Sequence, residues 1–361
     1  MKVVVEKCNS YEEAEKAVEE GLKKLGGIER FVKKGEKVLI KPNLLGARKP
    51  EEAVTTHPEV VRAVIKQAKK VTSEIAIGDS PGYVGNLKGW NAVIEKTGMK
   101  KVAEEEKVKL QPLDTPKEVR NENGMIAKKF MIAEEIAKYD KIISVSKLKT
   151  HSLTIFTGAV KNMFGIIPGR LKSGMHMRYE STENFSKMLL DLYTLKKADL
   201  NIMDGIVGME GQGPNAGDLK NFGIIAMSED ALALDYAITK GLKLEVPMIR
   251  IAQQRNMIKE VEIEGGLSGE IKRPGTSIAE SIIMPLAGSL RRKLTSRPAL
   301  IKEKCTKCVS CYNTCPAKAI EMKPYPEFDY SKCIRCYCCH EVCPEKAIYL
   351  KKSLAQKILR R

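Results

Sequence analysis

The placement of the cysteines constrains the fold of this sequence more than any other feature. Of ten cysteines in 361 residues, one is Cys8 and the other nine lie between Cys305 and Cys343. A secreted protein held together by disulfides would spread its cysteines along the chain and carry a signal peptide, which the acidic start MKVVVEKCNSYEEAEKA does not predict. Crowding of this kind indicates that the thiolates bind metal.

The cysteine-rich segment is an internal repeat with a spacing of 28 residues. KCTKCVSCYNTCPAKAI (304–320) is followed by KCIRCYCCHEVCPEKAI (332–348), and each copy contains C-x2-C-x2-C-x3-C-P. Three cysteines at intervals of three wrap a compact turn around one face of an iron–sulfur cubane, and the fourth begins a separate element. Zinc is the main alternative, but its four-ligand sites do not explain two runs of four cysteines.

Residues from about 300 to 352 therefore resemble a two-[4Fe-4S] ferredoxin module, and two such clusters are the expected cofactors. In two-cluster ferredoxins the fourth cysteine of each run binds the other cluster. The resemblance assigns to cluster 1 Cys305, Cys308, Cys311 and Cys343, and to cluster 2 Cys333, Cys336, Cys339 and Cys315. Cys338 falls outside the spacing and is expected to be a spare packed thiol, with replacement of Cys339 as the alternative.

The charge of the chain limits its partners. The 62 Lys and Arg residues exceed the 45 Asp and Glu residues, which gives a formal net charge of +17. Such a balance is compatible with nucleic-acid binding, but only 5% of the residues are aromatic, so few side chains are able to stack on bases. No apolar run approaches the roughly 18 residues needed to cross a bilayer. We expect a globular cytoplasmic protein without a membrane segment, for which nucleic acid is a disfavoured partner.

The cysteine-rich part is itself basic. From Ala299 onward it contains 13 Lys and Arg residues against 6 Asp and Glu residues. Free ferredoxins are commonly acidic, so this departure disfavours an independent electron shuttle. The basic surface either offsets the negative charge of the clusters or binds an acidic redox partner protein.

The rest of the chain alternates apolar strands with amphipathic helices. The predicted strands are 3–6, 37–43, 74–82, 141–151, 200–208 and 222–230, and the predicted helices are 11–32, 57–71, 86–106 and 231–241. This alternation predicts a layered α/β domain over residues 1–270, with a mostly parallel sheet and helices on both faces. A connector (271–299), a small α+β ferredoxin-like domain (300–352) and a basic tail (353–361) are expected to follow.

Polar segments follow several predicted strands, at the edge where open α/β sheets bind ligands. In chain order they are KPN (41–43), TTHP (55–58), GDSPG (78–82), KLKTH (147–151), TGAVKNMFGIIPG (157–169) and MDGIVGMEGQGP (203–214). The first five, read in this order, resemble the family known as domain of unknown function 362, which is often joined to ferredoxin modules. The resemblance covers residues 36–240 and implies the architecture, but no reaction. Walker and G-x-G-x-x-G patterns are missing, so the sequence does not support an ATP or NAD site.

These segments supply the candidate functional side chains of the α/β domain. Histidine titrates near neutral pH and strand-end carboxylates exchange protons, so the expected catalytic residues are His57, Asp79, His151 and Asp204. Lysines in apolar, glycine-flanked surroundings indicate a cationic pocket, so the expected substrate-binding residues are Lys41, Asn43, Lys147, Lys149, Lys161 and Asn162. The ordinary alternatives are helix or turn capping for His57 and Asp79, and solvent-exposed positions for the lysines. His176, in KSGMHMR, is a weaker candidate.

Two functions are compatible with these features. The leading hypothesis is an iron–sulfur oxidoreductase that reduces a small anionic substrate in the α/β domain with electrons delivered through two [4Fe-4S] clusters. The alternative is a non-catalytic electron carrier or cofactor-assembly factor that recognises a protein partner through the α/β domain. Clustered lysines repel one another unless an anion or the two aspartates lie between them. The first hypothesis therefore predicts one anion-binding pocket at the sheet edge, with the ferredoxin module over that edge.

Overall fold

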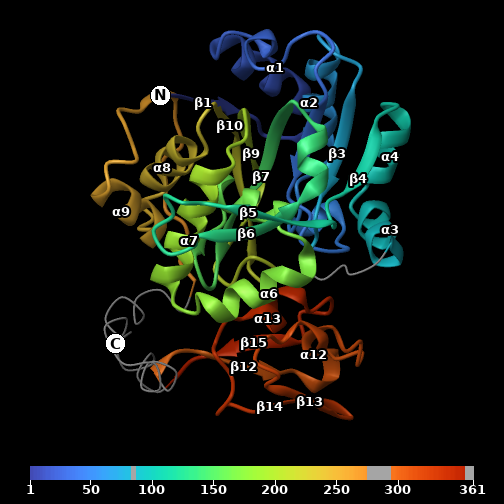
Figure 1. The fold of residues 1–361 in the computed structure, drawn as a ribbon, viewed down its shortest axis with the longest axis vertical. Helices are drawn as coiled ribbons and strands as arrows, with labels where there is room; N and C mark the ends of the chain where they lie inside the picture. The colour runs from blue at the N-terminus through green and yellow to red at the C-terminus, as the bar shows by residue number, and fades with distance from the viewer. Residues whose placement is uncertain (83–86, 275–293, 354–361) are drawn as a thin grey trace.

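The computed structural model of the chain describes residues 1–82, 87–274 and 294–353. A large α/β part lies above a small part that carries the cysteine repeat, and helix α6 (Gly169–Arg178) lies between the two (Figure 1). Most of the predicted connector (residues 275–293) and nearly all of the predicted basic tail (354–361) fall outside the described residues.

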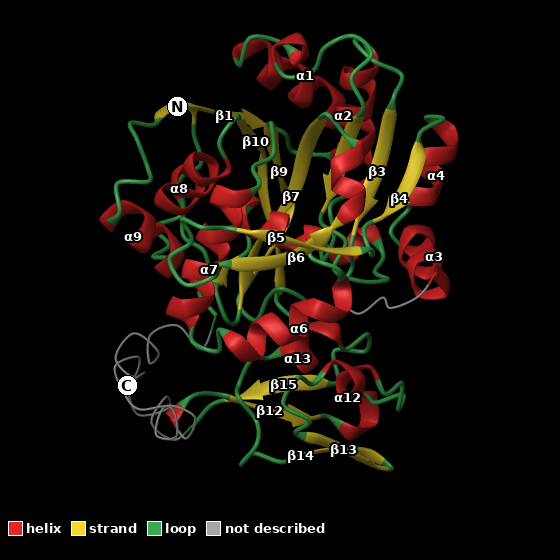
Figure 2. Cartoon of the chain, viewed as in Figure 1, coloured by secondary structure: helices red, strands yellow, loops and turns green. Residues whose placement is uncertain are grey.

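The large part is organised around a mixed sheet with the strand order β11-β1-β10-β9-β7-β2-β3-β4, in which β8 pairs with β7. Its strands are β1 (Lys2–Lys7), β2 (Val38–Pro42), β3 (Ile75–Asp79), β4 (Lys109–Pro112), β7 (Lys141–His151), β8 (Ile155–Phe156), β9 (Leu200–Glu210), β10 (Asp218–Ser228) and β11 (Glu262–Gly265). Strands β4, β3, β2, β7 and β9 run parallel to one another. Their carboxyl ends therefore meet at one edge of the sheet, which is the edge that faces α6 and the small part (Figure 2).

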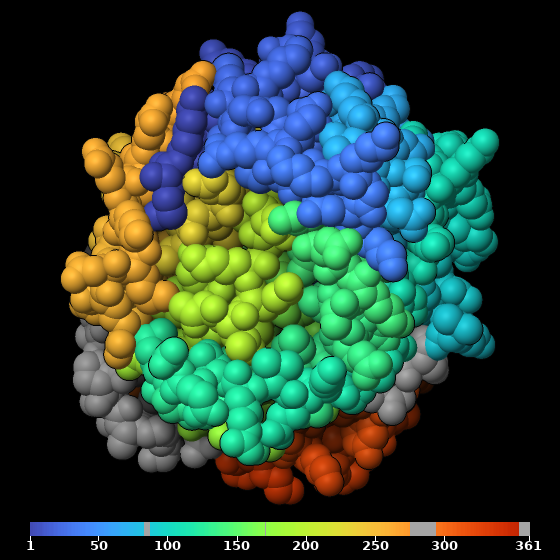
Figure 3. Space-filling model, turned by 45° about the horizontal axis from the view of Figure 1, so that its top comes forward, coloured from blue at the N-terminus to red at the C-terminus, as the bar shows by residue number. Residues whose placement is uncertain are grey.

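The predicted α/β class and mostly parallel sheet are confirmed, although the sheet is mixed, because some of its pairings are antiparallel. Strand β10 runs antiparallel to both β9 and β1. Only residues 211–217 join β9 to β10, and so short a connection forms a hairpin, because a parallel crossover needs a dozen or more residues. Strand β1 also pairs with β11, so that the start of the chain lies against residues near 262 (dark blue against orange in Figure 3).

Helices cover both faces of the sheet. One face carries α1 (Ala14–Lys24), α2 (Pro58–Lys69), α3 (Leu87–Lys96) and α4 (Met99–Glu105), and the other carries α5 (Ala159–Asn162), α7 (Thr182–Leu195), α8 (Ala231–Gly241) and α9 (Pro247–Gln254). Glycines interrupt two predicted helices: Gly26 and Gly27, with φ of 100° and 87°, follow the end of α1, and Gly98, with φ of 77°, separates α3 from α4. None of the described helices is long and apolar enough to cross a membrane.

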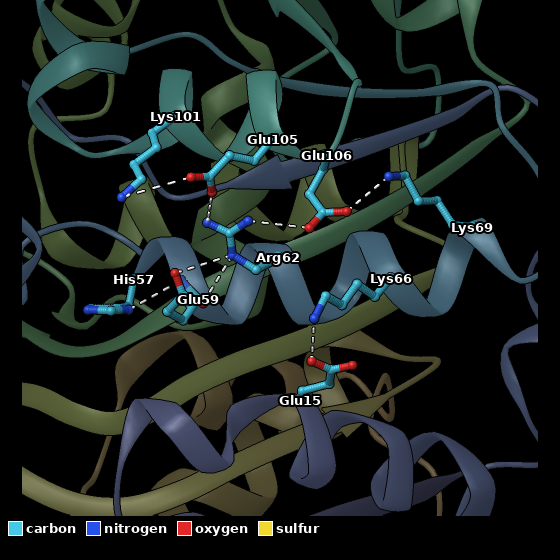
Figure 4. Close-up of polar contacts among 9 residues, drawn as sticks. All are labelled: Glu15, His57, Glu59, Arg62, Lys66, Lys69, Lys101, Glu105 and Glu106. Atoms are coloured by element: carbon cyan, nitrogen blue, oxygen red, sulfur yellow. Dashed lines mark hydrogen bonds and ion pairs between the residues drawn. The ribbon is translucent and has the colours of Figure 1, made fainter.

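On the outer face of α2, some of the many lysine and arginine residues of the chain form ion pairs. Arg62 joins α2 to α4 by binding Glu105 at 2.6 Å and Glu106 at 3.3 Å, and Lys66 binds Glu15 of α1 at 2.6 Å (Figure 4). Pairs as exposed as these contribute about 0–1 kcal/mol each. They show that basic residues on this face have acidic partners within the chain.

The small part preserves the sequence repeat in its backbone. Strand β12 (Arg297–Leu300) pairs with β15 (Ile348–Lys351), β13 (Ile320–Lys323) pairs with β14 (Tyr325–Phe328), and the short helices are α12 (Ser310–Thr314) and α13 (Cys338–Val342). Left-handed backbone conformations recur 28 residues apart, at Lys307 and Arg335, Val309 and Tyr337, and Lys318 and Lys346. The two cysteine loops therefore have the same local geometry.

Candidate functional site

A cavity lies where the carboxyl edge of the sheet meets the small part; we call it the interface pocket. Its lining comes from the ends of β2 and β3, from α5 and α6, and from α12 and α13. The residues that line it include Lys41, Asn43, Asp79, Ser80, Lys161, Asn162, Phe164, Gly165, Lys172, His176, Cys338, Glu341 and Val342. It encloses about 660 Å³, including the part open to solvent, and it shares wall residues with a larger groove of about 1670 Å³ between the two parts.

A buried ion pair forms one wall of the interface pocket. Lys41 Nζ lies 2.7 Å from Asp79 Oδ1, both side chains are buried, and Asp79 Oδ2 accepts a hydrogen bond from the Leu44 N–H at 2.8 Å. Burial lowers the pKa of Lys41, and the Asp79 carboxylate opposes that shift. Gly165 packs directly on the pair, where any Cβ would collide with Lys41 Nζ and Asp79 Oδ1. Because its two charges compensate each other, this pair offers little net charge to a ligand.

Two other lysines face the pocket without a carboxylate in ion-pair contact. Within the described ranges, the Lys161 ammonium makes no hydrogen bond or ion pair, and it lies 6.0 Å from the centre of the Phe164 ring. Lys172, on α6, donates a hydrogen bond to the main-chain oxygen of Ser80. Burial lowers the pKa of both ammonium groups, and that of Lys172 falls to about 7. These two side chains are the cationic groups with which a bound anion would interact.

His151 connects the sheet edge to the small part. Its Nδ1 accepts hydrogen bonds from the N–H groups of Leu153 at 3.1 Å and Thr154 at 3.3 Å, so in the neutral ring the proton is on Nε2. Nε2 lies 3.2 Å from Oε1 of Glu341, which lines the pocket from α13. Burial and the nearby Lys161 charge hold the pKa of His151 well below its usual value. The lowered pKa favours the neutral histidine, whose ring lies against the Glu341 side chain without a hydrogen bond between Nε2 and Oε1.

Two amides and one lysine support the walls. Lys149 Nζ donates to Asn43 Oδ1 at 2.9 Å and to the Val54 carbonyl at 2.5 Å, and burial holds its pKa well below the usual value. Asn162 Nδ2 donates to Ser144 Oγ at 2.9 Å and to the Lys41 carbonyl at 3.2 Å. The buried Lys149 side chain thus positions Asn43, which lines the pocket.

The remaining predicted residues form a separate cluster. Lys147 Nζ lies 2.7 Å from Asp204 Oδ2 and 3.0 Å from the Tyr11 hydroxyl, and the His57 N–H donates to the same Asp204 oxygen at 2.9 Å. The rings of Tyr11 and His57 stack at 3.5 Å, and His57 Nδ1 caps α2 by accepting from the Glu59 N–H. None of these residues lines the interface pocket. The predicted residues were expected to line one pocket, but only some of them do so.

One of the two predicted sets of ligand cysteines lines a single cavity. Cys305, Cys308, Cys311 and Cys343 line one cavity of about 350 Å³. Burial raises the pKa of Cys339 well above its usual value, and the thiols of Cys336, Cys333, Cys315 and Cys311 contribute in the same direction. The N–H groups of Ala319 and Ala347 donate to the sulfurs of Cys315 and Cys343 at 3.3 and 3.2 Å, as is common around cluster thiolates. The four cysteines around this cavity are the number of thiolate ligands that one [4Fe-4S] cluster requires.

Main-chain oxygens of α13 and of the residues that follow it are bound by the large part. The Arg48 guanidinium donates to the carbonyls of Cys343, at 2.5 Å, and Pro344, and Asn215 Nδ2 donates to the carbonyls of Cys343 at 2.9 Å and His340 at 3.3 Å. His340 Nε2 in turn lies 3.4 Å from the Gln212 carbonyl. Sequence patterns do not indicate Arg48, Asn215 or Lys172, because their roles depend on contacts between segments that are distant in the chain.

Comparisons with known proteins divide the chain in the same way. Residues 38–240 match the family described as "Domain of unknown function (DUF362)", and residues 304–352 match the family described as "4Fe-4S dicluster domain". The chain is 34% identical over 289 residues to the "Thylakoid-associated protein sll1697" of Synechocystis sp. (strain ATCC 27184 / PCC 6803 / Kazusa), a match that covers 76% of this chain and 86% of that protein.

A solved structure, that of the lactate racemase apoprotein from Thermoanaerobacterium thermosaccharolyticum, matches with a TM-score of 0.41 and 15% identity. The match covers 62% of this chain and about half, 53%, of that chain. A similarity this low carries no inference about the site.

Proposed function

Since the chain belongs to the DUF362 family and contains a 4Fe-4S dicluster domain, we propose that it is an iron–sulfur oxidoreductase that reduces a small anionic substrate in the interface pocket. In this proposal two [4Fe-4S] clusters are held by the crossed cysteine sets, Cys305, Cys308, Cys311 and Cys343, and Cys333, Cys336, Cys339 and Cys315. When bound, the clusters supply electrons one at a time. An external redox protein is the reductant, and a two-electron reduction takes up two protons.

The observation that carries the proposal is the wall that α13 contributes to the pocket. Cys338, Glu341 and Val342 line the pocket, and in the sequence they are interspersed with the proposed ligands Cys339 and Cys343. A molecule in the pocket would therefore lie against the helix that contains the proposed ligand Cys339 and is followed directly by the proposed ligand Cys343. A pocket on another face of the molecule would not offer so short a path for electrons between the proposed clusters and a bound substrate.

The residues of the chain have distinct proposed roles. Lys161 and Lys172 bind the anion, and Asn43 and Asn162 offer amide groups at the same cavity. The Lys41–Asp79 pair keeps the end of β2 and β3 rigid beneath the substrate. Of the side chains predicted to handle protons, Asp79 lines the pocket and His151 contacts its wall, whereas His57 and Asp204 act elsewhere.

The proposed electron donor is an acidic protein that docks near cluster 1. Cys308 is exposed, and so are the neighbouring Lys302, Lys304 and Lys307, which supply complementary charge. A cytoplasmic location is part of this proposal, because thiolate ligands persist where glutathione and thioredoxin keep cysteines reduced.

The test uses anaerobically purified full-length protein that has been reduced with dithionite. Rapid mixing with nitrite, sulfite, 2-oxo acids and unsaturated dicarboxylates, followed by visible absorbance, measures reoxidation by each anion. We expect at least one anion to reoxidise the protein, and Lys161→Gln to slow that reaction tenfold or more without changing the iron content. The matched control is Lys117→Gln, at an exposed lysine of β5 (Pro116–Arg120). Failure of every anion, or equal rates for wild type and Lys161→Gln, would favour the non-catalytic carrier or assembly factor.

A further inference from the structure

The two unpaired ammonium groups of the interface pocket differ in their surroundings. Lys161 lies near the Glu341 carboxylate, which favours its charged form. The carboxylate near Lys172 is Asp79, and Asp79 already forms an ion pair with Lys41. Among the residues that the structure describes, the Lys172 ammonium donates its hydrogen bond to the main-chain oxygen of Ser80 and forms no ion pair of its own.

We infer that the interface pocket is a proton-coupled anion site, in which Lys172 takes up a proton from solvent when a small carboxylate or inorganic oxoanion binds. The inference rests on the proposed function and assigns the proton donor that this function lacks. An ammonium that has lost its hydration is stabilised by an opposite charge within about 4–6 Å, so anion binding and protonation of the amine favour each other. The bound anion then lies beside an N–H group that is able to donate a proton during reduction.

The groups that face Lys172 are compatible with this coupling. Lys41 and Lys161 both disfavour its charge, and Asp79 favours it. His176 follows one turn later on α6, and burial holds its pKa at about 3, so that it is neutral near pH 7. Glu341 lines the opposite wall and contacts His151. With a pKa of about 7, free Lys172 is largely unprotonated above neutral pH, whereas an exposed lysine titrates near 10.4.

Calorimetry of the anaerobic holoprotein with sulfate tests the coupling, because sulfate keeps its charge between pH 6 and 9. Titrations at one pH in buffers of different ionisation enthalpy give the number of protons taken up. We expect uptake to approach one proton per sulfate near pH 8, and the affinity to fall about tenfold per pH unit above the pKa of the free amine. Lys172→Arg should bind sulfate without uptake, because guanidinium is charged throughout this range. Lys117→Met is the control and should behave as wild type.

The outcomes separate this inference from the proposed function. Sulfate binding without proton uptake, or uptake that persists in Lys172→Arg, would overturn the coupling and leave the anion pocket in place. No sulfate binding at pH 6 would contradict the anionic substrate itself, and the coupling with it.

A second measurement needs no substitution in the buried site. Competitive acetylation of wild-type protein with acetic anhydride, followed by peptide mass spectrometry, gives the titration midpoint of each lysine. We expect a midpoint near 7 for Lys172, well below the roughly 10.4 of an ordinary lysine, and we expect saturating sulfate to move it upward. A Lys172 midpoint close to that of an ordinary lysine, or one that sulfate leaves unchanged, would refute the inference.

Discussion

Replacing Asp204 with asparagine removes the negative partner of Lys147 from a site without access to water. Both side chains are fully buried and their charged atoms are 2.7 Å apart. Removal of one partner from a buried ion pair costs about 3–5 kcal/mol, because the other charge is left uncompensated. Asparagine is still able to accept the His57 N–H, and burial lowers the pKa of Lys147, which allows the amine to become neutral. We therefore expect a loss near the lower limit, about 3 kcal/mol.

Hydrogen exchange of the anaerobic holoprotein, followed by mass spectrometry, measures this loss in peptides from β7 and β9. A loss of about 3 kcal/mol corresponds to exchange that is faster by about a hundredfold. The matched control is Asp199→Asn at the other end of the same strands, where Asp199 pairs with Lys141 and the side chains are 34% and 28% exposed. Its loss should stay below about 1 kcal/mol.

Adding Lys147→Met to Asp204→Asn removes the second charge and should restore most of the protection, since no unpaired charge is left buried. Two results would refute this reasoning. Equal exchange in Asp204→Asn and Asp199→Asn would mean that burial does not strengthen the pair. A double variant as unstable as Asp204→Asn would assign the loss to packing instead.

Three further predictions concern the small part and its interface. Arg48→Met removes charged hydrogen bonds to the Cys343 and Pro344 carbonyls, so exchange in the 338–344 peptide should rise about tenfold or more while β7 stays protected. Burial lowers the pKa of His176 from 6.5 to about 3, so the unfolded chain binds more protons than the folded one and the free energy of unfolding falls as the pH drops below 6.5. His176→Phe removes this effect. In denaturant titrations it should therefore recover about 1.4 kcal/mol at pH 5.5 relative to pH 8. Cys338→Ser should retain about eight iron atoms per chain by elemental analysis, whereas Cys339→Ser should lose about half.

Local sequence patterns were sufficient for the architecture of the chain. The predicted ferredoxin-like segment and the resemblance over residues 36–240 are confirmed by the family matches at 304–352 and 38–240. The strands with continuous apolar runs, such as β2, β3 and β7, lie where they were predicted. The interruptions of two helices and the antiparallel direction of β10 were not predicted. A left-handed glycine ends a helix, and a short hairpin connection reverses the chain, without altering the apolar pattern of the residues around them.

The pocket was less accessible to sequence reasoning than the fold. Lys41, Asn43 and Asp79 line it because they follow parallel strands whose ends meet at one edge. Lys147 has the same kind of sequence context, but its side chain binds Asp204, and the register of β7 against β9 shifts between Lys147 and Lys149. Position at a strand end is therefore insufficient to predict that a residue lines the pocket, because the direction of its side chain must also be known.

Lys172 illustrates a different limit. It lies in a helix that no apolar periodicity predicted, and its contact with Ser80 joins segments 92 residues apart. A lysine in a polar stretch is normally an exposed residue. Only the packing of α6 between the sheet edge and the small part makes it a buried group, and that packing depends on both parts of the molecule.

The interface pocket depends on the contact between the two parts, and this has a thermodynamic consequence. Its walls come from both, and Arg48 and Asn215 hold the Cys343 carbonyl in place. A ligand that binds only the assembled pocket stabilises that contact by RT ln(1 + [L]/Kd), and any change that loosens α13 weakens the ligand by the same free energy. Under the proposed function, binding of the anion and retention of the proposed ligand Cys343 are therefore coupled, so a saturating anion should slow the loss of iron from the Arg48→Met variant.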